Sequence, residues 1–530
     1  MKKIKEKLAA WIRGERVTGS TICALVIGVI IAFNAIVYAF SVKYDLYLAY
    51  EVEDDLTISS ASEVLFADAI EEAKETGERV RIVFCRSKSQ FDPQSSTYTN
   101  DATAKFYITA KQFEEKYPDF IELAYVNLLT KRMSVGESDK ETLIDLTEIQ
   151  TEDGEGGYFP LYNSSVVFMS NKPELGRDKR YVQDITSAAF TLASESSDSF
   201  SSYNGEEIIA SMALWVVTPK SEHKNAYITT YHGEQPDVTL INMLTCAGYS
   251  IDILDLRQHE LVPEDADLVV ISNPTKDFAT STENSDLFSE IDKLERYVEE
   301  GGNLYVALDP YVDKLHILED FLEKYGIVFS EPEDAKDKDV VRHIIRDNDN
   351  AITADGFTLV ADFADAEDVI TKDAVKFNEN GKVIIRESAA LKIVDDKLAK
   401  PILVSSPASS IYEGSERVDD SGSYCVAALS SFDTENGNRS NIFVVPSVYI
   451  TANDALEKKG YANRDFLYSV FDNVFGMEDV PYGCSPVYRR DAVLENLTMK
   501  TARIYTVIIL SIPVALAAVG AVITIKRKNR

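Results

Sequence analysis

Three short polar turns in the middle of the chain carry residue types that could bind a ligand or move a proton. Each turn follows an apolar run typical of a buried strand. The candidate residues are His232, Gly233, Glu234, Asn273, Pro274, Asp309 and Pro310. A histidine beside two carboxylates could polarise a water molecule or hold a cation. Glycine, proline and aspartate are also what ordinary strand-to-helix turns require, so a purely structural role fits the same residues.

The elements around these turns alternate between strands and helices. Apolar runs predict strands at 226–231, 249–254, 267–272 and 303–308. Amphipathic helices are predicted at 285–300 and around 315–325, and another around 240–247 is stopped by Gly248. This alternation is typical of a doubly wound α/β fold with a parallel sheet. Because ligands bind at the carboxyl ends of such strands, we expect the three turns to form one candidate cleft.

Enzyme signatures are absent from the sequence. A hydrolase would need a Ser or Cys nucleophile on a sharp strand-to-helix turn, but no G-x-S-x-G occurs and Cys246 falls inside a predicted helix. No G-x-x-x-x-G-K-[ST] motif occurs either, so the chain is not expected to hydrolyse ATP. The acidic segments 148–155 and 331–339 lack the ligand spacing of a calcium loop. No catalytic residue, metal site or cofactor is therefore predicted.

The cysteines are scattered rather than clustered. Cys85, Cys246, Cys425 and Cys484 stand alone, without a C-x-x-C motif or zinc-ligand spacing. They are interpreted as buried free thiols, and an occasional disulfide in an oxidising compartment is the alternative. Redox chemistry at Cys85 is not expected, because no second cysteine lies near it in sequence.

Two uncharged segments near the ends are long enough to cross a bilayer. They predict transmembrane helices at 19–40, where residues 21–40 are the uncharged run, and at 504–525. For the first, a cleaved signal peptide is the alternative, although the run exceeds the usual length of such a segment. Basic tails at 1–18 and 526–530 lie outside the two runs. The positive-inside rule therefore places both termini in the cytoplasm and residues 41–503 outside the plasma membrane.

Small residues in both runs could let the two helices pack closely in lipid. They are Ala24, Gly28, Ala32, Ser511, Ala515, Ala517 and Ala521. Ordinary apolar filler is the alternative interpretation. The chain carries a net charge of −33; with +8 on the two tails, the part between the apolar runs carries −41. Such a field repels phosphates, so nucleic acid is not an expected partner.

The extracytoplasmic part divides by composition. Residues 45–200 form an α/β block, for which a thioredoxin-like arrangement is one interpretation. Its predicted elements are strands at 79–84 and 121–128, a helix at 102–117, an acidic loop at 136–157 and an apolar segment at 165–169. The serine-rich stretch 194–204 suggests a boundary. A second α/β region spans 205–476, and residues 477–503 connect it to the membrane.

Several segments of the second region resemble a known family. They are NAYITTYHGEQ (225–235), LTCAGYSIDILDL (244–256), PEDADLVVISNPTKDF (263–278) and LERYVEEGGNLYVALDP (294–310), followed by SNIFVVPSVYIT (440–451) and ANRDFLYSVFDNVFG (462–476). Together they resemble the GldG-like auxiliary component of ABC-2-type transport systems, a family associated with gliding motility. That family usually has Gly-Asn before the last helix, where this chain has Ala462-Asn463. The resemblance covers residues 205–476.

The resemblance implies an extracytoplasmic α/β domain with class I amidotransferase-like architecture. It also implies an ABC permease and a cytoplasmic ATPase as partners, and a non-enzymatic accessory role. Two other hypotheses remain open from the residues. One is an extracytoplasmic hydrolase-like enzyme and the other a small-molecule sensor, each using a crevice formed by His232, Glu234 and Asp309.

Overall fold

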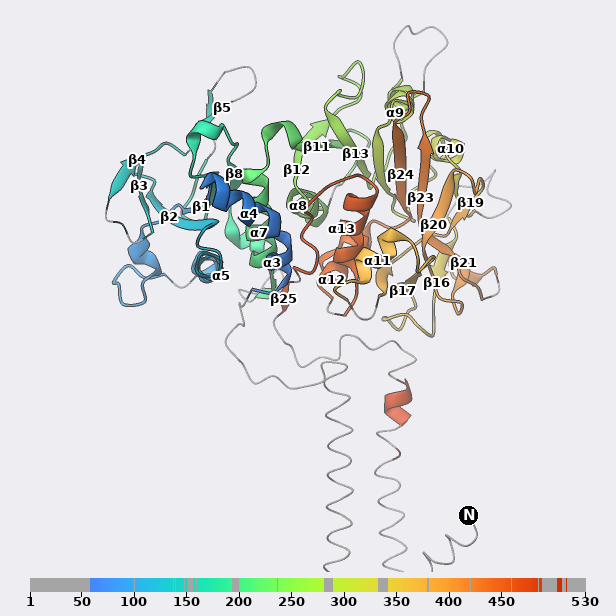
Figure 1. Cartoon of the computed structure of the whole chain (residues 1–530). Helices are drawn as coiled ribbons and strands as arrows, with labels where there is room; N and C mark the ends of the chain where they lie inside the picture. The colour runs from blue at the N-terminus through green and yellow to red at the C-terminus, as the bar shows by residue number, and fades with distance from the viewer. Residues whose placement is uncertain are drawn as a thin grey trace, which may run out of the picture. The chain divides into compact units, whose positions relative to one another are not determined.

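The computed structural model describes residues 58–488 with short gaps, together with 503–507 and 511. The gaps are 100, 137, 139, 147, 151–155, 159, 193–199, 236, 281–288, 332–341, 379–380, 420, 459 and 485. The predicted span at 19–40 and most of that at 504–525 lie outside the described residues. Within the described ranges no helix has the length and apolar character needed to cross a membrane. These residues form a mixed α/β structure (Figure 1).

The N-terminal part is built on a six-stranded sheet in the order β4-β3-β2-β1-β7-β8. β1 and β2 are parallel, whereas β7 runs antiparallel to β1 and β8 antiparallel to β7. The bounds are β1 Val80–Phe84, β2 Ile121–Asn127, β3 Arg132–Val135, β4 Glu141–Leu143, β7 Val166–Ser170 and β8 Arg180–Val182. Helix α5 (Ala102–Lys116) connects β1 to β2, and Asp101 caps its first turn. The strands predicted at 79–84 and 121–128, the helix at 102–117 and the apolar segment at 165–169 are thus confirmed to within one or two residues.

Two segments expected to be irregular contain strands. The acidic loop at 136–157 includes β4, β5 (Glu148–Gln150) and part of β6 (Gly156–Tyr158). The serine-rich stretch includes β10 (Phe200–Tyr203), which pairs with β9 (Phe190–Leu192) and β25 (Val487–Tyr488). These strands are two to four residues long. Strands this short do not show the alternation of apolar and polar residues by which longer strands are predicted.

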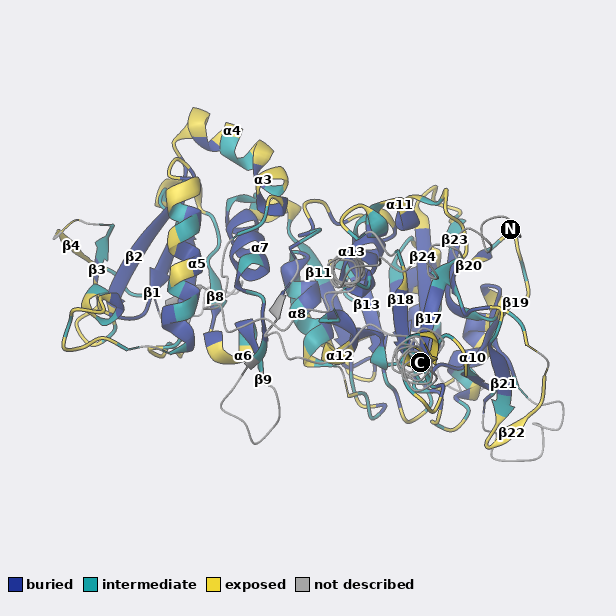
Figure 2. Ribbon diagram, turned by 90° about the horizontal axis from the view of Figure 1, so that it is seen from below, coloured by how far each residue is buried: buried dark blue, intermediate teal, exposed yellow. Residues whose placement is uncertain are grey.

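Helix α7 (Gly205–Val217) is the centre of the described unit. It contacts α3 (Ala61–Leu65) and α5 of the N-terminal part and α8 (Val238–Cys246) of the second region. Figure 2 shows its buried residues between α5 and α8. One hydrophobic cluster runs through this helix and includes side chains from both sides of the predicted boundary. The nearly all-apolar sequence of α7 is explained by this burial on every side.

The first and last residues of the main described range both attach beside α7. The backbone N–H of Ser59 donates to Glu206 Oε1 at 2.9 Å, and Ser62 Oγ donates to the same oxygen at 2.5 Å. At the other end, Val487 pairs with Tyr203 in the β10–β25 ladder. The residues that hold the two ends, Tyr203 and Glu206, are three positions apart and lie next to the start of α7.

The second region contains one large sheet, and its first half is parallel. Strands β12, β11, β13, β14 and β24 lie side by side in that order, all parallel. Their bounds are β11 Lys224–Thr229, β12 Tyr249–Leu254, β13 Ala266–Ser272, β14 Asn303–Ala307 and β24 Arg439–Val445. The chain passes from β11 to one side and then crosses to β13 on the other. The switch point of this doubly wound half therefore lies between the carboxyl ends of β11 and β13.

The second half of this sheet is antiparallel, a feature that the predicted doubly wound parallel sheet does not include. From β24 the order continues β23-β20-β17-β18, each strand antiparallel to its neighbour. Their bounds are β17 Thr358–Phe363, β18 Val383–Arg386, β20 Ala399–Val404 and β23 Cys425–Asp433. The strand–helix alternation that predicts parallel pairing stops after β15 (Ile327–Phe329). Among the described residues between β15 and β24, α11 (Val369–Val375) is the one α-helix between strands, and the neighbouring strands pair antiparallel.

Both faces of the parallel half are covered by helices. Alternate residues of β11 separate onto two cores: Ala226 and Ile228 join the cluster containing α8 and α13 (Asn463–Asn473), whereas Tyr227 joins the other. The second cluster contains α9 (Glu290–Glu299) and α10 (His316–Lys324). Burial of each large apolar side chain stabilises the fold by about 1.5–3 kcal/mol. The expected helices are confirmed, with two refinements. The described part of α9 begins after its capping residue Ser289, and Cys246 ends α8 rather than lying inside it.

Candidate functional site

The switch point is marked by unusual backbone conformations. Tyr231 and Gly233, just past β11, have φ of 79° and 75°, and Asn273, just past β13, has φ of 55°. Positive φ is ordinary for glycine but costs energy for other residues, above all for a bulky one such as tyrosine. The loops at this edge of the sheet are therefore held in specific shapes by their surroundings.

His232 lies at the centre of this edge and is bound by two carboxylates. Its Nδ1 lies 2.8 Å from Glu234 Oε1, and its Nε2 lies 3.1 Å from Glu290 Oε2. The ring stacks on Phe278 with centroids 3.9 Å apart. The exposed fractions of the three polar side chains are 5% for His232, 1% for Glu234 and 9% for Glu290. The result is a buried carboxylate–imidazole–carboxylate bridge, called here the His232 bridge.

The electrostatics of the His232 bridge favour a charged imidazole. Burial alone lowers the pKa of His232, but hydrogen bonds to Glu234 and Glu290 outweigh it and the pKa is raised. For Glu234, burial raises the pKa, and the hydrogen bonds from His232 and from backbone N–H groups outweigh it and lower the pKa. With both ring nitrogens donating, the imidazole has no lone pair to accept a proton or bind a metal. General-base chemistry at His232 would require the bridge to open first.

The second polar turn joins the first. The carbonyl oxygen of His232 accepts hydrogen bonds from the backbone N–H groups of Thr275 and Lys276, both at 2.8 Å. Asn273 donates its backbone N–H to the carbonyl of Ala307 at 2.8 Å, which ties the turn to β14. The side-chain oxygen of Asn273 is buried without a hydrogen-bond partner among the described atoms. His232, Gly233 and Glu234 are thus brought beside Asn273 and Pro274, as the sequence predicts.

The third polar turn forms a separate structure. The Asp309 carboxylate accepts the backbone N–H of Tyr311 at 2.9 Å, which is a local turn contact. The Asp309 carbonyl accepts from Arg342, a side chain only 1% exposed that also pairs with Glu319 at 2.6 Å. Among the described residues, no hydrogen bond or ion pair joins Asp309 or Pro310 to His232. The crevice of His232, Glu234 and Asp309 stays a prediction.

Sequence reasoning missed the residues that complete this edge. Glu290 lies 58 positions beyond His232 and opens α9, where Ser289 and Asp292 form a capping box. The S-x-x-D pattern marks that helix start, but nothing in the sequence connects it to a distant histidine. Arg257 was missed as well: its guanidinium lies 3.7 Å from the centre of the Tyr231 ring and pairs with Asp255 at 3.0 Å.

The other predicted site residues have simple outcomes. Of the seven small residues expected to pack the membrane helices, only Ser511 is described, so that packing stays a prediction. Cys85, Cys246, Cys425 and Cys484 are free thiols, and burial raises the pKa of Cys85 and of Cys425 to about 12. Among the residues with described positions, no cluster of three or more His, Cys, Asp or Glu side chains is arranged to hold a metal ion.

The chain was compared with protein families, curated proteins and solved structures. No protein-family model and no curated protein matches the chain. A ThuA-like protein from Bacteroides uniformis is 14% identical, over 49% of this chain and 95% of its own, with a TM-score of 0.29. PurLQS from Thermotoga maritima is 13% identical, over 48% and 99%, with a TM-score of 0.28. The carbohydrate deacetylase Agd3 is 12% identical, over 48% and 32%, with a TM-score of 0.26. All three TM-scores are below 0.5, and the mixed α/β architecture of this chain is defined by its own strands and helices.

Proposed function

We propose that this chain is a non-enzymatic, membrane-anchored accessory subunit of an ABC-type transport system. Its two uncharged end segments serve as transmembrane anchors, and the part between them is an extracytoplasmic domain that contacts a substrate or a partner. An ABC permease and its cytoplasmic ATPase are the proposed partners. The parallel half of the large sheet is the part proposed to have class I amidotransferase-like architecture. If its strands β11, β12, β13, β14 and β24 are numbered 1 to 5 along the chain, their order in the sheet is 2-1-3-4-5.

The observation that carries the non-enzymatic part of this proposal is the His232 bridge. A general base at His232 would need an imidazole able to take up a proton, whereas both nitrogens of His232 face carboxylates at 2.8 and 3.1 Å. The same contacts give the loops after β11 and β13 a fixed shape. A preformed loop surface lowers the ordering cost of binding another molecule, which supports a recognition role.

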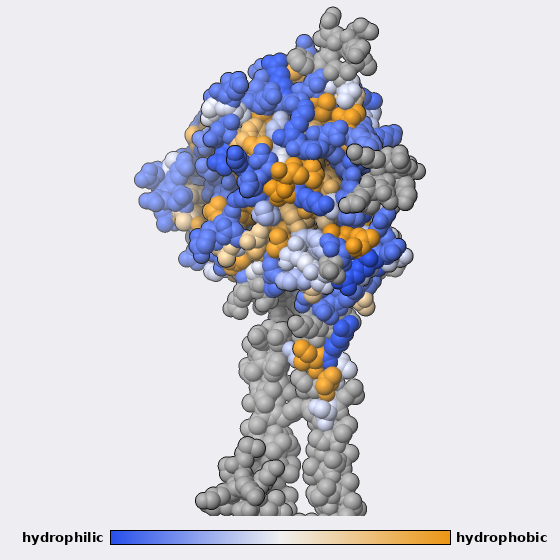
Figure 3. Space-filling view, turned by 90° about the vertical axis from the view of Figure 1, so that its right-hand side faces the viewer, coloured by the Kyte–Doolittle hydropathy of each residue, from blue (hydrophilic) through white to orange (hydrophobic). Residues whose placement is uncertain are grey.

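Surface composition supports an aqueous setting for this domain. The face drawn in Figure 3 is mostly hydrophilic, with hydrophobic residues in separate patches. The net charge of −41 between the two apolar runs points the same way. Both features fit a domain that stands outside the bilayer and meets partners through specific contacts rather than through an extended apolar face.

Co-purification tests the proposal directly. The tagged full chain is expressed in the organism that encodes it, extracted in a mild detergent, and its partners are identified by mass spectrometry. We expect a permease with several membrane spans and an ATPase carrying a G-x-x-x-x-G-K-[ST] motif. A secreted version limited to residues 41–503 is the matched control and should lose both partners. Recovery of the folded full chain with neither partner would overturn the proposal.

A cellular test separates the accessory role from the hydrolase alternative. The double variant His232→Gln and Glu234→Gln removes the charges of these two residues while keeping side chains that can hydrogen-bond. An accessory subunit should retain its partners and its transport phenotype wherever the variant still folds. Loss of the phenotype with partners still bound would favour the hydrolase-like enzyme or the sensor instead.

A further inference from the structure

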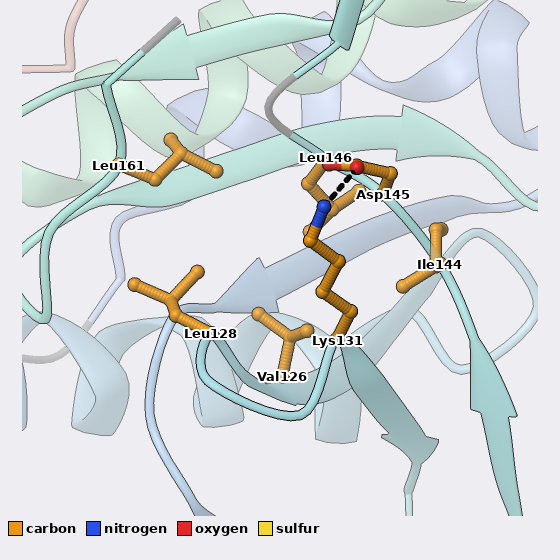
Figure 4. Close-up of a pocket in the computed structure, with 7 residues that line it drawn as sticks. All are labelled: Val126, Leu128, Lys131, Ile144, Asp145, Leu146 and Leu161. Atoms are coloured by element: carbon orange, nitrogen blue, oxygen red, sulfur yellow. Dashed lines mark hydrogen bonds and ion pairs between the residues drawn. The ribbon is translucent and has the colours of Figure 1, made fainter.

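A cavity of about 190 Å³ lies in the N-terminal part, far in sequence from the His232 bridge. Its walls come from β2, from the turn that follows it and from the segments around residues 145 and 161. Figure 4 shows Leu128 and Leu161 on one side of the cavity and Ile144 on the other, with Lys131 reaching between them toward Asp145. The lining residues are Val126, Leu128, Lys131, Ile144, Asp145, Leu146 and Leu161.

The cavity walls are held in place by the Lys131 turn. Lys131 adopts φ of 51°, a conformation that costs energy for a residue with a side chain. Its carbonyl accepts the backbone N–H of Ile144 at 2.9 Å, and its ammonium pairs with the Asp145 carboxylate. Main chain and side chain of one residue thus fix both the position of the 144–145 segment and the width of the cavity. Leu146, at the far side of this segment, is 3% exposed and belongs to the adjoining core.

The size and lining of the cavity define a ligand class. An apolar cavity of about 150 Å³ is large enough to hold a benzene ring, so this cavity has room for one six-membered ring. Five of its seven lining residues are aliphatic, and the two others form an ion pair. Because that pair is charge-compensated and offers both a donor and an acceptor, it suits a hydroxyl or an amide better than a charged group. The net charge of −33 disfavours an anion further.

Two leucines that adjoin lining residues in the sequence point away from the buried core. Leu129 and Leu143 are 96% and 78% exposed, the highest values among the large hydrophobic side chains of the described ranges. They are the sequence neighbours of Leu128 and Ile144 respectively, and neither lines the cavity. We propose that this cavity binds a small neutral amphiphile, with an apolar ring or branched body inside it and one hydroxyl or amide at the Lys131–Asp145 pair.

The proposal does not depend on the transport role. Cyclohexanol is the neutral probe, cyclohexanecarboxylate the anionic probe of the same ring size, and inositol the polar one. Binding to the full chain in lipid nanodiscs is followed by saturation-transfer NMR. We expect saturable binding of cyclohexanol, binding of cyclohexanecarboxylate weaker by about tenfold or more, and no binding of inositol. Stronger binding of the anion than of the alcohol would overturn the assignment of a neutral head group.

Matched variants show whether the probe sits in this cavity. Leu128→Trp places an indole inside the cavity, whereas Leu129→Trp adds the same group one residue away on an exposed side chain. We expect Leu128→Trp to weaken cyclohexanol binding about tenfold or more and Leu129→Trp to leave it within twofold. If Leu128→Trp fails to fold, Leu161→Phe fills the cavity from a second lining residue. Unchanged binding in a folded cavity-filling variant would refute the site.

Discussion

The side-chain amide of Asn463 bonds both backbone groups of Ile384, accepting from its N–H at 2.8 Å and donating to its carbonyl at 2.7 Å. Ile384 belongs to β18, the last strand of the large sheet, so its outer backbone groups would otherwise lack partners. The backbone N–H of Ala462 adds a third bond, to the carbonyl of Lys382. The start of α13 therefore covers the edge of this sheet, and an alanine at position 462 is compatible with that contact.

Replacing Asn463 should destabilise the sheet edge. Asn463→Ala leaves the buried N–H and carbonyl of Ile384 unpaired, and we expect a loss of roughly 2–4 kcal/mol in the free energy of unfolding. Asn473→Ala is the control on the same helix, because its amide bonds an exposed carboxylate, Asp373, at 3.0 Å. Its expected cost is below about 1 kcal/mol. Urea unfolding of the full chain in detergent, followed by tryptophan fluorescence, measures both; equal costs would contradict the edge role.

The His232 bridge should make stability depend on pH. A histidine whose folded-state pKa is raised contributes stability that is complete below its unfolded-state pKa of about 6.5 and is lost as the pH rises through the folded-state value. We therefore expect the free energy of unfolding to fall as the pH rises from about 6.5 through the folded-state pKa of His232. His232→Gln should abolish this fall and lower stability at pH 6.5 by about 3–5 kcal/mol, because two buried carboxylates lose their cation.

The pH window separates His232 from other titrating groups. Burial raises the pKa of Asp465 to about 6, so its contribution falls mainly below the window. Burial lowers the pKa values of His223 and His343, which also titrate below it. Urea midpoints are measured at half-unit steps for wild type and for His232→Gln. Parallel curves for the two proteins would show that the bridge does not carry the titration.

Two neighbouring glutamates at the start of α7 should behave differently. Glu207 is 1% exposed and pairs with Arg464 at 2.5 Å, so Glu207→Gln leaves a buried cation uncompensated and should cost about 3–5 kcal/mol of global stability. Glu206 bonds Ser59 and Ser62, and Glu206→Gln should mainly loosen the first described residues. Hydrogen exchange with mass spectrometry distinguishes the two. Faster exchange confined to residues 58–66 is expected for Glu206→Gln alone.

A glycine pair isolates the crowding at the switch point. Gly233 and Gly414 have similar φ of 75° and 60°, but a Cβ on Gly233 would lie 2.1 Å from Thr275 Oγ1, whereas nothing lies within 4 Å of one on Gly414. Gly414→Ala should cost about 1 kcal/mol for its backbone conformation alone. Gly233→Ala should cost clearly more, and adding Thr275→Ala should recover part of the difference. Equal costs for the two glycines would show that the Thr275 contact does not matter.

Periodicity predicted most of the fold because most of its elements have one buried face. Apolar spacing predicted the strands that begin at or next to Arg79, Ile121, Tyr249 and Asn303. It also predicted the helices around Leu294 and Leu318. The antiparallel half of the large sheet did not follow, since strand direction depends on connections between distant segments. The short strands β4 and β10 were also missed, because three or four residues are too few to show a periodic side-chain pattern.

The candidate site was predicted in part for a similar reason. His232, Glu234 and Asn273 could be placed at neighbouring strand ends because parallel strands share one carboxyl edge. Glu290 could not, since its partner lies across a long excursion of the chain, and a carboxylate opening a helix is usually explained by the helix alone. The bond from Arg342 to the Asp309 carbonyl could not be predicted either, since Arg342 comes from a segment without a recognisable pattern.

The attachments of Ser59 to Glu206 and of Val487 to Tyr203 have a mechanical consequence. Tension arriving through the residues before Ile58 and after Tyr488 meets the folded unit at these two attachments, which together form one joint. The six-stranded sheet and the large sheet therefore lie outside the path of the force. A pull strong enough to separate β25 from β10 would peel that joint open while the large sheet stayed folded. The joint could then act as a hinge on which the whole unit swings without deforming.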